Sequence, residues 1–155
     1  MLFRSLAAVL LVACACLLAA CGGSGDDGGE RYVQRVNKAQ EDFAARVDEL
    51  TRGITAQSSA ARDRRTLRSF EEAVDRVGGD LRAIEPPRDV RRLHEQLVSA
   101  VDVYGDSVQT AARTLETARS PERLRDAQRE LAQATTTFGT RLNETIERIN
   151  RQLSG

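Results

Sequence analysis

The sequence contains no tryptophan, one methionine, one histidine and three prolines, and aromatic residues make up only 4% of its 155 residues. It also lacks net charge, because 23 basic residues balance 23 acidic ones. A nucleic-acid-binding protein of the basic type needs a clear cationic excess, so we expect no nucleic-acid partner. The hydrophobic fraction of 41% excludes a disordered chain, and the length predicts one domain.

The three cysteines all fall within the first 21 residues. Residues 1–4 carry one positive charge, and residues 5–18 are almost continuously apolar. This apolar run is shorter than the roughly 20 residues that span a membrane comfortably, but its length suits a signal peptide. We therefore predict that residues 1–20 are a removed signal peptide. Cys14 and Cys16 would leave with it.

The motif Leu18-Ala19-Ala20-Cys21 resembles a bacterial lipobox, with leucine three positions before the cut and small residues next to it. This resemblance to lipoproteins implies that Cys21 receives a diacylglycerol thioether and fatty acyl chains such as palmitate, and becomes the mature N-terminus. It implies a protein anchored in the cell membrane on its extracytoplasmic face, or in the outer membrane of a diderm bacterium. The alternatives are an ordinary secretory signal with incidental cysteines and a single uncleaved helix.

Residues 21–29 follow the signal peptide and contain five glycines and two aspartates, which predicts a flexible tether. If Cys21 is acylated, the mature chain has no disulfide, no cysteine metal site and no thiol nucleophile. Over its whole length the chain is similar to small uncharacterised helical lipoproteins of actinomycete-type bacteria. No functional residue carries over from that similarity.

Residues 30–155 show the apolar spacing of four amphipathic helices, in steps of three and four residues as in a coiled coil. Gly53 and the polar residues after it end the first helix, and Pro86-Pro87 ends the second. Ser120-Pro121-Glu122 begins the fourth, with serine as N-cap and proline at the first helical position. Short connections between long helices predict an all-α, up-down-up-down antiparallel four-helix bundle.

Apart from Tyr32 at the start of the first helix, each predicted helix carries one aromatic residue on its apolar stripe: Phe43, Phe70, Tyr104 and Phe138. Counted from one end of the bundle at ~1.5 Å per residue, all four lie ~20–24 Å along it. We expect them to form one aromatic layer. Gly105 and Gly139 follow two of these residues, and we expect them to admit bulky rings from neighbouring helices, the alternative being a small-ligand pocket.

Gln40 is the one clearly polar residue on a regular apolar stripe. It would fix the register of the helices, as buried asparagine does in coiled coils, or it would contact a ligand inside the bundle. Asn143 lies at a similar level on the fourth helix and is its expected hydrogen-bond partner.

Catalytic constellations are missing. His94, the single histidine, follows Arg91 by three residues, so the Glu-x-x-His pairs of di-iron bundles are absent. We expect His94 to pack at a helix edge rather than to serve a Ser-His-Asp triad. A spacing of four residues predicts ion pairs between Arg68 and Glu72 and between Arg91 and Glu95, which are ordinary stabilising contacts on a helix surface. We expect no enzyme activity, no metal and no cofactor.

Arginines are concentrated at the starts of the second and third helices, where positive charge opposes the helix dipole. They are the predicted contact surfaces for a partner or the membrane: Arg62, Arg64, Arg65, Arg68, Arg88, Arg91 and Arg92. An ordinary solvated face is the alternative. The sequence favours a non-catalytic lipoprotein that docks a protein or polymer of the cell envelope. The second possibility is a small-ligand-binding or sensor ectodomain with an interior pocket.

Overall fold

The computed structural model describes residues 27–52 and 60–154, which are almost entirely helical. The predicted signal peptide, Cys21 and residues 22–26 of the predicted tether lie outside the described residues. The helices begin close to the expected positions, although the first includes three residues that we assigned to the tether. The elements are α2 (Asp27–Arg52), α3 (Ala60–Arg82), the short 3-10 helix η1 (Arg88–Val90), α4 (Arg91–Thr117) and α5 (Pro121–Ser154).

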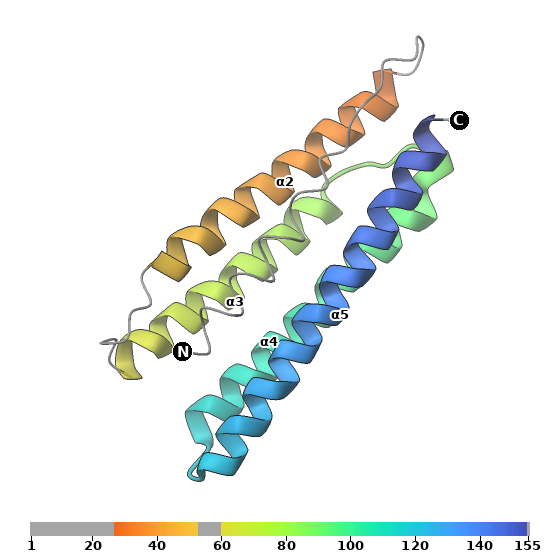
Figure 1. The fold of residues 1–155 in the computed structure, drawn as a ribbon. Helices are drawn as coiled ribbons and strands as arrows, with labels where there is room; N and C mark the ends of the chain where they lie inside the picture. The colour runs from red at the N-terminus through yellow and green to blue at the C-terminus, as the bar shows by residue number, and fades with distance from the viewer. Residues whose placement is uncertain (1–26, 53–59, 155) are drawn as a thin grey trace.

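The four long helices alternate in direction, as Figure 1 shows. The start of α2, the turn at Pro86-Pro87 and the end of α5 share one end of the molecule, called here the proline end. The start of α3 and the α4–α5 turn lie toward the opposite end. The predicted up-down-up-down four-helix bundle is therefore confirmed.

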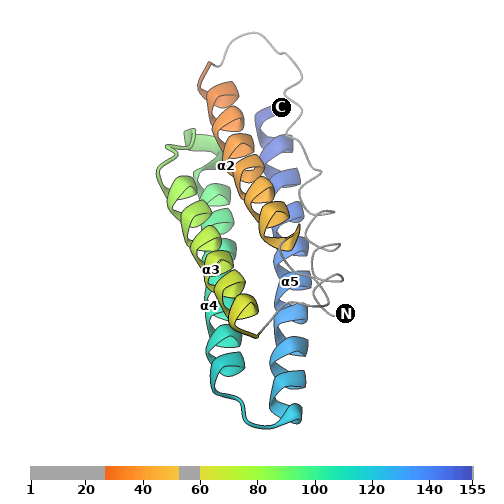
Figure 2. The same ribbon diagram turned by 90° about the vertical axis from the view of Figure 1, so that its left-hand side faces the viewer.

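Neighbouring helices of the bundle are not all equally close to one another. Consecutive helices pack against one another along their lengths, whereas the backbones of α2 and α5 come close at very few points. In Figure 2, α3 lies over α4, whereas α2 overlaps α5 only toward the gold end of α2. The side between α2 and α5, called here the α2–α5 seam, is thus the widest between neighbouring helices.

The core consists of the apolar stripes that the sequence predicts. Its most buried side chains include Val36 on α2, Val74 and Leu81 on α3, Leu97 on α4 and Ile149 on α5. Burying such side chains contributes about 1.5–3 kcal/mol each. This packing stabilises the helices without disulfides.

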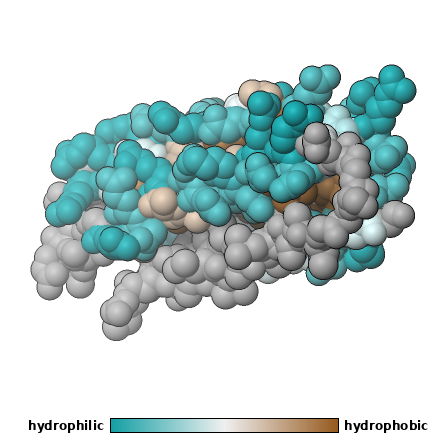
Figure 3. Space-filling view, turned by 90° about the horizontal axis from the view of Figure 1, so that it is seen from above, coloured by the Kyte–Doolittle hydropathy of each residue, from teal (hydrophilic) through white to brown (hydrophobic). Residues whose placement is uncertain are grey.

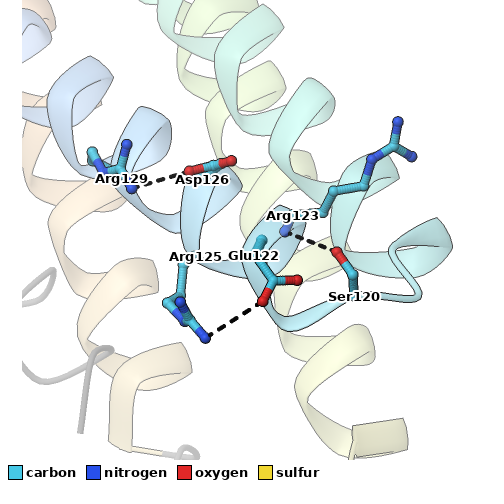
Figure 4. A network of polar contacts seen from close by, with 6 residues as sticks. All are labelled: Ser120, Glu122, Arg123, Arg125, Asp126 and Arg129. Carbon is cyan, nitrogen blue, oxygen red and sulfur yellow. Dashed lines mark hydrogen bonds and ion pairs between the residues drawn. The ribbon is translucent and has the colours of Figure 1, made fainter.

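Two sequence signals for helix ends work as expected. α3 ends at Arg82, shortly before Pro86-Pro87, where the helix could not continue because proline lacks an amide donor and restricts the residue before it. At the opposite end the Ser120 hydroxyl accepts a hydrogen bond from the Arg123 backbone N–H at 3.3 Å, capping α5 (Figure 4). Glu122–Arg125 and Asp126–Arg129 ion pairs follow in the first turns.

Candidate functional site

The aromatic layer is present. Phe43 and Phe70 have ring centroids 6.5 Å apart, Phe70 meets Tyr104 edge-on at 6.4 Å, and Tyr104 stacks on Phe138 at 4.5 Å with an angle of 6°. The four rings therefore form a continuous row through all four helices, which confirms the predicted layer. Phe70 is only partly buried, whereas the other three rings are buried.

The glycine beside Tyr104 serves a different neighbour from the one expected. A Cβ on Gly105 would stand 3.4 Å from a methyl group of Val74 on α3. The glycine thus lets α3 and α4 approach through an aliphatic side chain, and our expectation of a bulky ring at this glycine was wrong. The Val74 side chain occupies the space beside Gly105, and the Phe70 ring of α3 contacts Tyr104 instead.

Tyr104 is held by a hydrogen bond as well as by stacking. Its hydroxyl lies 3.2 Å from Oγ1 of Thr135, and that oxygen donates its own proton to the Leu131 carbonyl at 2.8 Å. Tyr104 must therefore be the donor to Thr135. Burial is the largest cause of the raised pKa of Tyr104.

Gln40 and Asn143 do not form the predicted hydrogen bond. The Gln40 amide nitrogen and the Asn143 amide oxygen are both enclosed, and neither has a hydrogen-bond partner. They are an unsatisfied donor and an unsatisfied acceptor, although they lie on the two helices expected. The backbones of α2 and α5 stand too far apart along most of this side for direct pairing to follow from level alone.

Sequence reasoning missed a polar contact near the proline end. His94 is buried, with 5% of its surface exposed, and its Nδ1 lies 3.2 Å from the hydroxyl of Tyr32 on α2. The two rings meet edge-on at 5.6 Å, and the backbone of Leu81 on α3 also bonds to the imidazole. Burial lowers the pKa of His94, and burial raises the pKa of Tyr32 to about 12. The histidine is therefore a neutral link between three helices.

The arginines at the start of α3 are exposed on the helix surface. Arg68 lies 3.6 Å from Glu116 of α4, so the expected pair with Glu72 does not form. Arg64 and Arg65 make no ion pair with any described residue. Helix packing brings Glu116 within reach of Arg68, a contact that spacing along α3 could not reveal.

The arginines at the start of α4 are also exposed: Arg88, Arg91 and Arg92. The expected Arg91–Glu95 pair is absent from the described contacts. Arg92 instead lines an open groove of about 450 Å³ between α4 and α5, together with Arg141 and Arg148. A second groove of about 480 Å³ runs between α2 and α3, and its lining includes Arg31, Arg35 and Asp80. The structure thus separates the two predicted arginine groups by the length of α3.

The described surface offers little apolar area. Hydrophilic side chains cover most of the coloured part of the face drawn in Figure 3, and Val103 is the single large apolar side chain that is exposed in the described ranges, at 50%. A partner that docks on these helices must therefore be held mainly by polar and charged contacts.

In the described residues no cluster of three or more histidine, cysteine or acidic side chains is placed to hold a metal ion. None of the described helices is both long and apolar enough to cross a membrane. No protein-family model, curated protein or solved structure matches the chain. Functional interpretation therefore rests on the residues alone.

Proposed function

We propose that the protein is a lipid-anchored, non-catalytic lipoprotein of the cell envelope whose helical bundle docks a protein or polymer partner. The observation that carries this proposal is the motif Leu18-Ala19-Ala20-Cys21, followed at once by a stretch rich in glycine and aspartate. Two or three lipid chains on one terminus hold a protein far more firmly than one acyl group.

The fold predicts which end of the bundle lies nearer to the membrane if the anchor is correct. If Cys21 carries the lipid, the proline end is the nearer to the membrane, because α2 starts there at Asp27. Arg88, Arg91 and Arg92 then face the lipid headgroups. Arg64 and Arg65 start the helix that begins at the other end, and an acidic partner is the chemistry that complements them.

The anchor is tested by the substitution Cys21→Ser, with Cys16→Ser as a matched control inside the signal peptide. The Cys21→Ser protein should accumulate as unprocessed precursor and incorporate no labelled palmitate, whereas Cys16→Ser should mature normally. A Cys21→Ser protein that matures and distributes like the wild type would overturn the proposal.

The partner is sought by affinity capture of the acylated protein from its native membranes, followed by mass spectrometry. The double variant Arg64→Glu/Arg65→Glu is compared with Arg88→Glu/Arg91→Glu, which carries the same charge change at the proline end. The first should lose the partner and the second should keep it. An unchanged partner list for Arg64→Glu/Arg65→Glu excludes that surface.

A second candidate function is a small-ligand-binding ectodomain, and one observation favours it. The enclosed, unpartnered amide atoms of Gln40 and Asn143 are the kind of groups that a bound polar molecule would satisfy. Native mass spectrometry of the protein purified from its source membranes tests this function, because a bound molecule would add a defined mass.

A further inference from the structure

We infer that the open groove between α4 and α5, called here the α4–α5 groove, binds a phosphodiester group between Arg141 and Arg148 of α5. Of the arginines that the sequence predicted as contact surfaces, this groove includes only Arg92. The inference goes beyond the docking function proposed above, and it does not depend on acylation of the chain.

Small side chains at the bottom of the α4–α5 groove make it hollow. Ala100 of α4 and Thr145 of α5 are each only 7% exposed, and Ser99 beside them is partly buried. The charged side chains that complete the lining are exposed. The groove therefore has a floor of small residues between long charged ones, and its volume of about 450 Å³ is open to a solute without movement of a helix.

The α5 side of the groove places a hydroxyl between two positive charges. Arg141, Thr145 and Arg148 stand at positions i, i+4 and i+7, so they share one face of α5. Neighbours at this spacing have Cβ atoms about 5–6 Å apart. Guanidinium groups on both sides of a hydroxyl are donors that an oxyanion accepts from, and hydrogen bonds between charged partners are the stronger kind.

A contact across the groove fixes the register of its two sides. Nη1 of Arg148 donates to Oε1 of Gln96 on α4 at 3.2 Å. Three residues farther along α4 comes Ser99, and three residues back along α5 comes Thr145, so the antiparallel helices place these two hydroxyls at one level. The bond to an uncharged amide also holds the Arg148 guanidinium at the groove without neutralising it, and leaves its other N–H groups for a ligand.

The hydroxyls of the groove floor are not used inside the protein. Thr145 makes no hydrogen bond with a described residue, and its oxygen is not closed off from solvent. Ser99 likewise has no hydrogen-bond partner in the described ranges. By contrast, Thr135, Thr136 and Thr140 of the same helix each donate to the carbonyl oxygen four residues earlier. Because nearly all buried polar groups have a partner, the Thr145 hydroxyl points to a group bound in the groove.

The charges of the groove favour a singly charged ligand over a doubly charged one. Its lining includes Arg92, Arg141 and Arg148 but also Glu95 and Glu144, and none of these side chains forms an ion pair with a described residue. A phosphate monoester carries a charge of about −1.5 to −2 at neutral pH, whereas a phosphodiester has only one ionisable oxygen. The single excess of positive charge therefore matches the diester.

The shape of the donor set distinguishes a phosphodiester from a carboxylate of the same charge. The oxygens of a carboxylate lie in one plane, whereas those of a phosphodiester are arranged tetrahedrally. A tetrahedral group can accept from both arginines of α5 and from the hydroxyls of Ser99 and Thr145 at once. Such a group occurs in phospholipid headgroups and in soluble phosphate esters, and the experiments below separate these two sources.

The first test uses the full chain in a non-ionic detergent, labelled with ¹⁵N, and dimethyl phosphate as the probe. Dimethyl phosphate should shift the Nε–Hε signals of Arg141 and Arg148 in a saturable way and leave that of Arg123, near the start of α5, in place. Methyl phosphate, which is a monoester, and acetate should bind more weakly. Tighter binding of either compound, or no saturable shift at Arg141 and Arg148, would overturn the inference.

Variants separate recognition from net charge. Arg148→Gln should weaken dimethyl phosphate binding about tenfold, because a charged hydrogen-bond donor is lost, and Thr145→Val should weaken it about threefold. Arg123→Gln makes the same charge change outside the groove and should leave the affinity unchanged. Glu144→Gln should allow methyl phosphate to bind at least as tightly as the diester. Equal losses in Arg148→Gln and Arg123→Gln would contradict a specific site.

Chemical modification identifies the source of the phosphodiester. Phenylglyoxal reacts with free guanidinium groups, and mass spectrometry measures the rate at each arginine of the full chain in phosphatidylglycerol vesicles. Protection of Arg141 and Arg148 relative to Arg123 without added probe would identify a lipid headgroup. Protection that requires dimethyl phosphate would identify a soluble ester. Absence of protection in both conditions would reject the groove as a binding site.

Discussion

At the scale of single residues, the polar side chains in the core differ in whether they have a hydrogen-bond partner. Tyr104, Thr135 and His94 are each buried with a hydrogen-bond partner, whereas Gln40 and Asn143 are not satisfied. Spacing predicted which positions face inward. It could not predict the partners of His94, because they depend on the rotation of α2 and α3 relative to α4.

The pH dependence of folding stability should reveal the titration of the buried His94. An unfolded histidine has a pKa near 6.5, and burial holds the pKa of His94 below that value. The unfolded state therefore binds a proton first as pH falls through about 6.5, so folding stability decreases by at most about 1.4 kcal/mol per pH unit from this group. Urea unfolding at pH 7.5 and 5.5 measures the change.

The control is His94→Gln, which retains a donor and an acceptor but does not titrate. The difference between its pH profile and that of the wild type isolates the histidine from the carboxylates, including nearby Glu95. Parallel profiles would contradict the prediction.

The loss of stability should differ according to which partner of the Tyr104–Thr135 hydrogen bond is removed. Tyr104→Phe removes the donor and leaves Thr135 bonded to the Leu131 carbonyl, so we expect a loss of about 0.5–1 kcal/mol. Thr135→Val leaves the buried Tyr104 hydroxyl without an acceptor and should cost about 1–3 kcal/mol. Chemical denaturation of both single variants and the double variant measures this. Equal losses that simply add in the double variant would show no coupling.

At the scale of elements, helix ends are the features that the sequence predicted best. Ser120, Pro121 and Pro86 act through local geometry, which is why their roles needed no tertiary information. Gly105 behaves differently, since its role depends on Val74 of another helix. The expected Arg68–Glu72 pair failed for the same reason, because a partner on α4 competes for the arginine.

Three substitutions with different expected effects test these elements. Ser120→Ala removes the α5 cap and should cost about 1 kcal/mol, whereas Ser107→Ala changes a mid-helix hydroxyl and should be neutral or slightly stabilising. Gly79→Ala should stabilise α3 by up to about 1 kcal/mol, because a Cβ there meets nothing within 4 Å. Thermal unfolding of the three variants compares them directly. Destabilisation by Gly79→Ala would show that α3 is not a regular helix at this residue.

At the scale of the whole molecule, the sequence predicted the topology and the common level of the four rings. Helix lengths and short turns determine both, so a count of residues sufficed. The unequal packing of the four sides was not predicted, because apolar stripes specify which residues face inward but not how far apart two stripes stand.

Orientation on the membrane is a prediction at this scale. With the acylated protein in vesicles, a fluorophore at Glu85→Cys should be quenched by spin-labelled headgroups more strongly when anionic lipid is present. Basic residues near such a surface contribute about 1 kcal/mol each. Arg88→Glu/Arg91→Glu should remove this dependence on anionic lipid, while Arg64→Glu/Arg65→Glu should retain it. Equal quenching in neutral and anionic vesicles would contradict the assigned orientation.

The wide α2–α5 seam has a consequence for the order in which the bundle opens. Of the described helices, α2 packs extensively only against α3, whereas α4 packs against both α3 and α5. Segments with fewer tertiary contacts open at lower free energy than the molecule as a whole. Backbone amides of α2 should therefore exchange with deuterium before those of α4, because detachment of this one helix, with the other three still assembled, should require less free energy than unfolding of the whole bundle.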